Sequence, residues 1–229
     1  MNEIIAKISA SSSVAIRSTE AKNDLSQPLY AVNWFDASPA WLYHLYNKLA
    51  SRSVYKIGGQ PLFKATVKDS ILSDKGKRQI LLIVKYPDGN AFKKLLESTY
   101  FKLVSILRIM AVKRFTFSFT KPEAKLNLKQ KYKAYALHHF DNRQLSEVLE
   151  GLKNEQSDVD IIYTGQTFAH LIRQSKGEAE VPVRNIIDSV IIYGGTSEEA
   201  LATHLKSEKY LAYFDTENPG YISSINRIF

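Results

Sequence analysis

Short apolar runs separated by turn residues predict alternating strands and helices from residue 28 onward. Four runs before residue 121 have the length and the β-branched or aromatic content of strands. They cover residues 29–35, 60–72, 79–86 and 113–120. Two helices with one apolar face each are predicted between them, the first with Ser38 as N-cap and Pro39 in its first turn, the second over residues 91–99. Gly58-Gly59 is predicted to end the first helix, and residues 73–77 to form a hairpin turn.

The same order of elements returns in the second part of the chain. Tyr30-Ala-Val-Asn-Trp-Phe35-Asp36 corresponds to Tyr135-Ala-Leu-His-His-Phe140-Asp141, and Gly59-Gln60 corresponds to Gly165-Gln166. The predicted strands of this part cover residues 135–140, 160–173, 185–193 and 222–229. Capping boxes predict where its two helices start: Asp141 with Gln144, and Thr196 with Glu199. A repeat at an offset of 105 to 110 residues indicates a duplicated unit.

Each copy has the βαββαβ order of a ferredoxin-like unit, so the predicted fold class is α+β. Such a unit covers one face of a four-stranded antiparallel sheet with helices and leaves the other face bare. A bare apolar sheet needs a partner, and we expect the two sheets to pair within the chain as a pseudo-dimeric α/β barrel. The expected divisions are an N-terminal extension (1–27), a first repeat (28–120), a linker (121–131) and a second repeat (132–229).

The net charge of +8 is divided unevenly between the copies. Residues 50–133 hold 19 Lys or Arg and 5 Asp or Glu, whereas residues 134–229 hold 8 and 14. A basic copy facing an acidic one favours pairing within the chain over pairing of like copies between chains. The alternative is that the asymmetry is only drift on solvated faces.

Composition excludes several kinds of protein. The chain has no cysteine, which rules out disulfides, thiolate metal sites and a cysteine nucleophile. No apolar run approaches the roughly 18 residues of a membrane span, and the first residues lack the basic start of a secretory signal. We therefore expect a cytoplasmic protein without a membrane partner, either a monomer with an internal pseudo-dimer or a homodimer. Catalytic triads, phosphate loops and dinucleotide fingerprints are absent.

Several short motifs resemble those of small domains of unknown function in the dimeric α/β barrel superfamily. They are Tyr30 to Asp36 with Pro39, Gly58-Gly59, Ile80 to Tyr86, Ser98-Thr-Tyr100 and Arg108-Ile-Met-Ala111. Ile71-Leu72 stands where the family has Glu-Gly, and the second copy keeps Ser207 and Tyr210 but has no counterpart to Arg108. The resemblance implies an eight-stranded barrel. The superfamily includes cofactor-independent monooxygenases, isomerases and haem-dependent enzymes.

Polar residues on the first strand of each copy are candidates for a ligand site. Asn33 and His138 alternate onto one face with small and aromatic neighbours, while Trp34 and His139 occupy the next positions. These residues either line a pocket, with His138 as an acid or base, or are satisfied polar groups of the core. The resemblance adds Tyr100 and Arg108. Arg108 is expected to steer an anionic ligand, or else this pair ties a helix to the sheet.

The remaining histidines give no sign of a metal. His44 and His204 are expected at the surface or its boundary, and His170 on a strand could join His138. None of the five histidines has the spacing of metal ligands, so we expect no metal and no haem or other cofactor.

The function predicted from the sequence is cofactor-free binding of a small apolar or aromatic carboxylate. The sequence leaves open whether the protein is an enzyme. One alternative is a non-enzymatic interaction or scaffold module. Another is nucleic-acid binding through the basic first repeat, because the two cations Lys113 and Arg114 are followed by alternating phenylalanines up to Phe119, like an RNA-recognition strand. That segment lacks the Gly-Phe-Gly-Phe pattern which lets bases approach a sheet.

Overall fold

A computed structural model of the chain describes residues 14–18, 26–72, 78–124, 132–140, 145–153, 159–173, 189–214 and 220–229. We call residues 26–124 the first half and residues 132–229 the second half. The first half contains β2 (Leu29–Ala37), α2 (Ala40–Lys56), β3 (Gln60–Leu72), β4 (Ile80–Tyr86), α3 (Gly89–Glu97), α4 (Thr99–Ala111) and β5 (Val112–Ala124). The second half contains β6 (Ala134–Phe140), α5 (Leu145–Lys153), β7 (Val159–Arg173), β8 (Ser189–Gly195), α6 (Glu198–Lys206), α7 (Glu208–Leu211) and β9 (Tyr221–Arg227).

The strands form a closed antiparallel barrel. Neighbouring strands follow the order β7-β5-β2-β4-β3-β9-β6-β8, and pairing of β7 with β8 closes the ring of eight. The two halves meet at β3–β9 and at β5–β7. In both halves the strand order is fourth, first, third, second: β5-β2-β4-β3 and β9-β6-β8-β7. Closure leaves few free edges for pairing with other chains.

Part of the N-terminal extension joins this sheet. β1 (Val14–Ser18) pairs antiparallel with β7, from Val14 opposite Arg173 to Ser18 opposite Ala169. β5 pairs with the opposite edge of β7 over the same residues. β1 therefore lies on the same edge of β7 as β8, next to residues of β7 that β8 does not reach.

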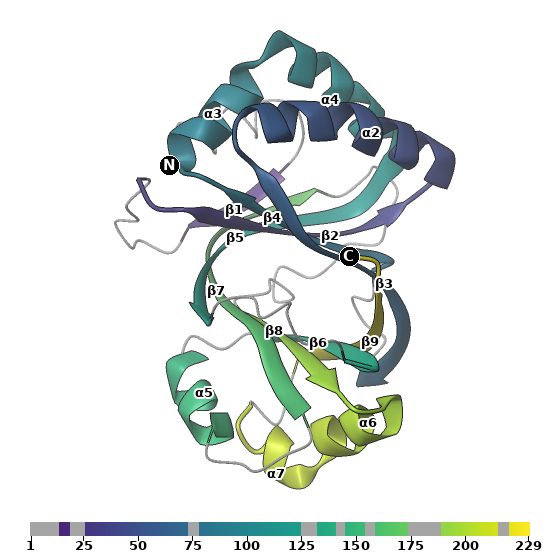
Figure 1. The fold of residues 1–229 in the computed structure, drawn as a ribbon, viewed down its shortest axis with the longest axis vertical. Coiled ribbons are helices and arrows are strands. Elements are labelled where there is room, and N and C mark those ends of the chain that lie inside the picture. Colours follow the sequence, from purple (N-terminus) through teal and green to yellow (C-terminus); the bar gives the residue numbers. More distant parts are fainter. Residues whose placement is uncertain are drawn as a thin grey trace.

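The helices lie outside the barrel, in one layer at each end of the molecule (Figure 1). α2, α3 and α4 cover the sheet of the first half, and α5, α6 and α7 cover the sheet of the second half. Side chains therefore alternate along each strand between a helix-covered face and the barrel interior. The result is two cores under helices and a third inside the barrel.

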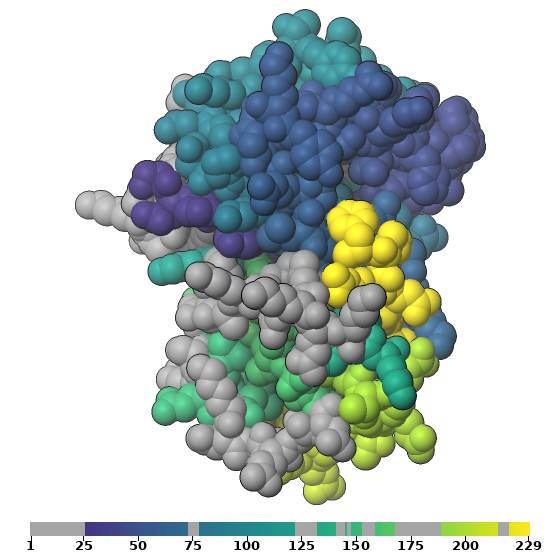
Figure 2. Space-filling view, in the orientation of Figure 1, coloured from purple at the N-terminus to yellow at the C-terminus, as the bar shows by residue number. Residues whose placement is uncertain are grey.

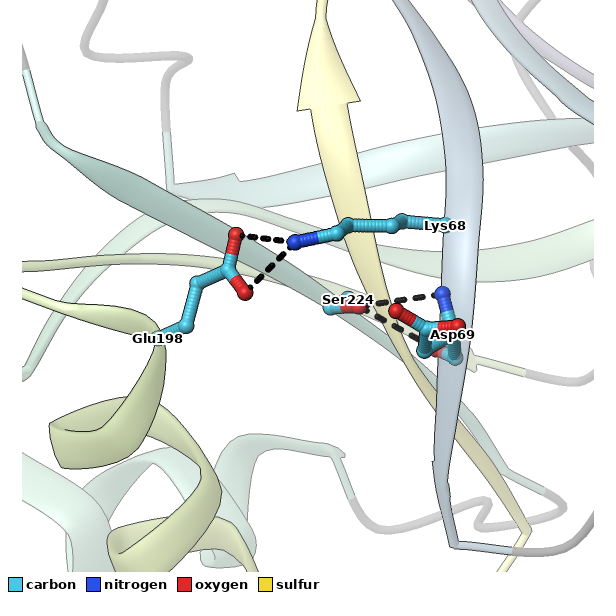
Figure 3. A network of polar contacts seen from close by, with 4 residues as sticks. All are labelled: Lys68, Asp69, Glu198 and Ser224. Atoms are coloured by element: carbon cyan, nitrogen blue, oxygen red, sulfur yellow. Dashed lines mark hydrogen bonds and ion pairs between the residues drawn. The ribbon is translucent and has the colours of Figure 1, made fainter.

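Polar contacts cross the junction between the halves where β3 meets β9. Figure 3 shows Lys68 on β3 with its Nζ 2.8 Å from both carboxylate oxygens of Glu198 at the start of α6. Beside it, the Asp69 amide donates to Ser224 Oγ at 3.1 Å. The Lys68–Glu198 pair is exposed and so adds little stability, but it joins a cation of the basic half to an anion of the acidic half.

The structure corrects two predicted helix starts. α2 begins after Pro39, and no side chain caps it; the Ser38 amide instead donates to Ala111 O at 2.8 Å, at the end of α4. α6 is capped by Ser197, whose hydroxyl accepts from the Ala200 amide, and not by Thr196. In α6 the capping hydroxyl is that of Ser197, three residues before the amide it accepts from. The helix therefore starts one residue later than the sequence predicted.

α4 was not among the predicted elements. Ser98 caps it by accepting from the Phe101 amide. The predicted helix over residues 91–99 is α3, which starts earlier because Asp88 caps it by accepting from the Ala91 amide at 2.7 Å. The predicted turn at residues 73–77, the capping box of Asp141 with Gln144 and residues 185–188 lie outside the described residues.

Gly58 and Gly59 end α2 as predicted. The Gly58 amide donates to Tyr55 O and the Gly59 amide to Val54 O, with Gly58 at φ +78°. This is the pair of hydrogen bonds that closes a helix on a residue in the left-handed region, which glycine adopts without steric cost. Among the described helices, none is long and apolar enough to span a membrane.

Candidate functional site

The first half contains a cavity of about 270 Å³ between its sheet and the helices α2 and α4. Residues of the strands line the side of the cavity next to the sheet, and residues of the helices line the opposite side. The wall residues that matter below are Asn33 on β2, Tyr43 and Tyr46 on α2, Lys64 on β3, Val84 and Tyr86 on β4, and Phe101 and Arg108 on α4. Phe35, Val54, Leu82, Val112 and Phe115 supply further apolar wall. The lining thus joins an apolar surface to a few polar groups, as ligand pockets do.

Two cations face this cavity without an acidic partner. No Asp or Glu belongs to the lining, and within the described part of the chain neither Lys64 nor Arg108 forms an ion pair. Arg108 Nε is buried and has no hydrogen-bond partner, while its guanidinium carbon lies 5.3 Å from the centre of the Phe115 ring. Lys64 is buried with its Nζ 5.1 Å from the centre of the Tyr43 ring, and burial lowers its pKa. An anion in the cavity would supply the missing charge.

Three phenols of the cavity are neutral donors. Burial raises the pKa of Tyr43, of Tyr46 and of Tyr86, and the charge of Arg108 only partly opposes the rise for Tyr46 and Tyr86. The Tyr43 hydroxyl is buried without a hydrogen-bond partner. Each phenol therefore keeps its proton at neutral pH and can donate it to a ligand oxygen, but cannot act as a base there.

Asn33 contributes an acceptor. Its Nδ2 donates to Leu82 O at 3.2 Å and to Ala31 O at 3.3 Å. Two carbonyl acceptors fix the orientation of the amide, so the nitrogen is committed to the backbone and Oδ1 is the atom left for a ligand.

The corresponding space in the second half is filled by a buried hydrogen-bonded chain. His138 Nδ1 lies 2.6 Å from the Tyr210 hydroxyl, which lies 2.8 Å from the Tyr193 hydroxyl. All three side chains are buried, and Phe214 packs on His138 and Tyr210 with ring centres 4.5 and 5.1 Å apart. These partners make His138 a satisfied group of the core in this structure.

Strand pairing identifies which residues differ between the two spaces. Asn33 lies opposite Leu82 and His138 opposite Ile191; two residues along, Ala31 lies opposite Val84 and Ala136 opposite Tyr193. The first half thus has Asn33 and Val84 where the second has His138 and Tyr193. Smaller side chains leave the space that the larger ones occupy.

The helix caps identify a third position at which the two halves carry different side chains. They also correct the expected role of Tyr100. Ser98 accepts from the Phe101 amide and Ser207 from the Tyr210 amide, so Phe101, and not Tyr100, corresponds to Tyr210. Tyr100 is 43% exposed and donates weakly to Leu49 O at 3.4 Å, outside the cavity lining. The predicted pair therefore separates: Arg108 reaches the cavity and Tyr100 lies on the surface.

Trp34 and His139 meet inside the barrel. Their ring centres are 4.1 Å apart, and Arg78 places its guanidinium carbon 5.4 Å from the centre of the Trp34 ring. Trp34 Nε1 and both ring nitrogens of His139 are buried without hydrogen-bond partners. Burial, together with the charges of His138 and Arg78, holds the pKa of His139 well below its usual range. His139 is therefore neutral, and it lies away from the cavity under α2 and α4.

The other predicted candidates lie apart from the cavity. His44 is exposed on α2, and His204 on α6 is half-buried with its ring centre 5.3 Å from that of Tyr210. His170 lies on β7, and its side chain is outside the described residues. No group of three His, Asp or Glu that could hold a metal occurs among the residues the structure describes.

The phenylalanines that suggested nucleic-acid binding are buried. Phe115, Phe117 and Phe119 face the helices of the first half, where Phe92 of α3 packs on the last two with ring centres 5.8 and 5.0 Å apart. They offer no open surface for stacking of bases.

The fold has relatives among solved structures. No family profile matches the sequence, and neither does any curated protein. An anthrone oxidase-like protein shares the fold over 94% of this chain and 95% of its own, with 11% identity and a TM-score of 0.54. A proposed monooxygenase from Fusobacterium nucleatum matches 90% of this chain and 94% of its own, with 12% identity and a TM-score of 0.47. At 11% identity, the likeness to the anthrone oxidase-like protein shows the fold alone.

Proposed function

We propose that the cavity of the first half binds a small apolar or aromatic carboxylate without a cofactor. The observation that carries this proposal is the pair of unpaired cations, Lys64 and Arg108, beside an apolar cavity whose lining has no acid. A carboxylate would accept from the Arg108 guanidinium, and from Lys64 or a phenol, with charge-assisted hydrogen bonds. Its apolar part would lie among Val84, Phe101 and their neighbours.

The size of the cavity limits the ligand. A volume of about 270 Å³ is just below the usual range for small-molecule sites, about 300–1,000 Å³, which favours one or two rings or a short alkyl chain. Asn33 Oδ1 would accept from a hydroxyl or amine on the ligand, so hydroxylated aromatic acids are favoured over plain ones. A scaffold without a ligand has no need for this cavity, and the buried hydrogen-bonded chain at the corresponding positions of the second half supports this view.

The binding test compares two arginine variants. A panel of aromatic acids, such as benzoate, salicylate and naphthoate, is screened by thermal shift and then by calorimetry. Arg108→Leu should weaken binding about tenfold to a hundredfold, because a charge-assisted hydrogen bond contributes about 1.5–3 kcal/mol. Arg52→Leu, an exposed arginine on α2, should bind like the wild type. Equal loss in both variants, or no stabilisation of the wild type by any acid, would refute the proposal.

We also infer that the barrel arose by duplication of one ferredoxin-like unit, with repeats at residues 28–120 and 132–229. The common strand order of the two halves and the corresponding cap serines, Ser98 and Ser207, support this inference. In this proposal the sheet of the second repeat covers the face of the first sheet that no helix covers. No second chain is then needed to complete the barrel.

A further inference from the structure

The outer surface of α2 and α4 carries an apolar patch. Most of the large hydrophobic side chains that are exposed in the described residues lie on these two helices. We call the following six the α2–α4 patch: Trp41 and Leu45 on α2, and Leu103, Ile106, Ile109 and Met110 on α4. A helix that is apolar on nearly every side, as α4 is, normally lies buried on every side. Its exposed side is therefore expected to have an occupant.

Hydrogen bonds bring the two parts of the patch together. The Ser38 amide bonds Ala111 O at 2.8 Å, and the Tyr100 hydroxyl bonds Leu49 O at 3.4 Å. α2 and α4 thus run antiparallel, with the first turns of α2 beside the last turns of α4. In Figure 1 the two helices form the outermost layer of the first half. The patch lies on the outside of that layer, away from the cavity.

The two helices that carry the patch have basic residues and no acidic ones, and the exposed acid nearest to α4 in the chain is Glu97 at the end of α3. Exposed cations lie near the patch residues in the sequence of both helices: Lys48 and Lys102 are within one helical turn of a patch residue, and Arg52 and Lys56 lie further along α2. Two such faces brought together would repel, which argues against a second copy as the occupant. An occupant with an anionic surface and an apolar interior fits both properties.

We propose that the α2–α4 patch docks on the surface of an anionic lipid bilayer. Apolar side chains with a tryptophan, bordered by lysine and arginine, are the features that hold helices in the interface of a membrane. We expected no membrane partner from the sequence because no run is long enough to span a bilayer, but docking at the surface needs no such run. The inference stands on surface residues and does not depend on what the cavity holds.

Flotation with vesicles tests the docking. Wild-type protein is mixed with phosphatidylcholine vesicles, with or without phosphatidylserine, at low and high salt. It should float with the anionic vesicles at low salt, and less without phosphatidylserine or at high salt, because screening weakens the attraction. Ile106→Glu should lower the partition coefficient about tenfold or more, because the isoleucine would be buried in the bilayer surface on docking and a glutamate would not. Ile228→Glu is the control, since both isoleucines are 53% exposed and Ile228 lies outside the patch; it should float like the wild type.

Three results would overturn the proposal. One is a wild type that stays unbound to anionic vesicles at low salt. Another is equal flotation of Ile106→Glu and the wild type. The third is a dimer in sedimentation analysis that Ile106→Glu dissociates, which would assign the patch to a second copy of the chain. Thermal unfolding of both variants checks that these exposed substitutions leave the fold intact.

Discussion

Buried polar atoms without partners mark the unusual places in this structure. In the described residues they fall on Trp34 and His139 inside the barrel, on Tyr43 and Arg108 at the cavity, and on Thr167 of β7. An unsatisfied buried group costs about 1–3 kcal/mol, so a fold keeps such groups where another molecule or a function offsets the cost. Under the proposed function, a ligand in the cavity would offset this cost for Arg108 and Tyr43, which both line it.

The neutral His139 makes stability depend on pH. Its pKa in the folded protein is well below 6.5, whereas the unfolded chain takes up the proton near pH 6.5. The unfolded state then binds more protons, so the free energy of unfolding falls as pH drops below about 6.5. His139→Leu should remove up to about 1.4 kcal/mol per pH unit from this slope between pH 6.5 and 5, as measured by urea unfolding. The same slope in wild type and variant would contradict a buried neutral imidazole.

At the scale of elements, the two halves share one strand order but differ in the length of their helices and in the side chains beneath them. Three larger or more polar side chains fill the space under the helices of the second half: His138, Tyr193 and Tyr210. In the first half Asn33, Val84 and Phe101 stand at these places and leave a cavity. The smaller side chains at these positions, together with a helix of 13 residues in α4 against four in α7, accompany the cavity of the first half.

Substitutions at one pair of corresponding positions, Val84 and Tyr193, should have opposite effects on ligand binding and on the free energy of unfolding. Val84→Phe fills the cavity, so it should block ligand binding while the free energy of unfolding stays within about 1.5 kcal/mol of wild type. Tyr193→Val opens a space in a packed core, so it should lower the free energy of unfolding by about 2–4 kcal/mol and leave ligand binding unchanged. Calorimetry and urea unfolding measure both effects. A Val84→Phe variant that binds normally would move the site elsewhere.

Apolar periodicity predicted most elements but missed α4. A strand that is half buried, such as β2, alternates visibly, and a helix with one apolar face has a clear period. α4 is apolar on its exposed side as well, so its period is hidden, and only Ser98 marks its start. The turn residues that bound β3 and end α2 were clear in the sequence, because glycine and proline act locally.

The sequence revealed part of the candidate site. Strand alternation indicated Asn33, and the resemblance indicated Arg108, and both reach the cavity. Lys64 was missed, because a lysine on a strand is normally solvated, and only the tertiary structure shows this one buried. Tyr43 and Tyr86 were missed for a similar reason: tyrosine is common in any core. His138 was indicated by the same alternation as Asn33, but its hydrogen-bond partner Tyr210 lies 72 residues away in the chain.

At the scale of the whole molecule, the cavity depends on both halves. Lys64 O accepts from the Ile228 amide at 2.7 Å, and the Lys64 amide donates to Phe229 O at 3.1 Å. The last residues of the chain therefore lie along β3, where Figure 2 shows them in yellow against the first half. Phe229 belongs to the cavity lining. Closure of the barrel thus places a side chain of the second half at the site of the first.

A methyl NMR titration with the acid that binds most tightly shows whether the ligand enters the cavity under α2 and α4. Isoleucine, leucine and valine methyl groups report on every core of the protein at once. Binding in the cavity should shift the methyl signals of Val54, Leu82, Val84 and Val112, because these residues line it. Those of Val148, Leu201 and Leu205 under the second-half helices, and of Val190 and Ile192 inside the barrel, should stay in place. Shifts confined to either of these two other cores would contradict binding in this cavity.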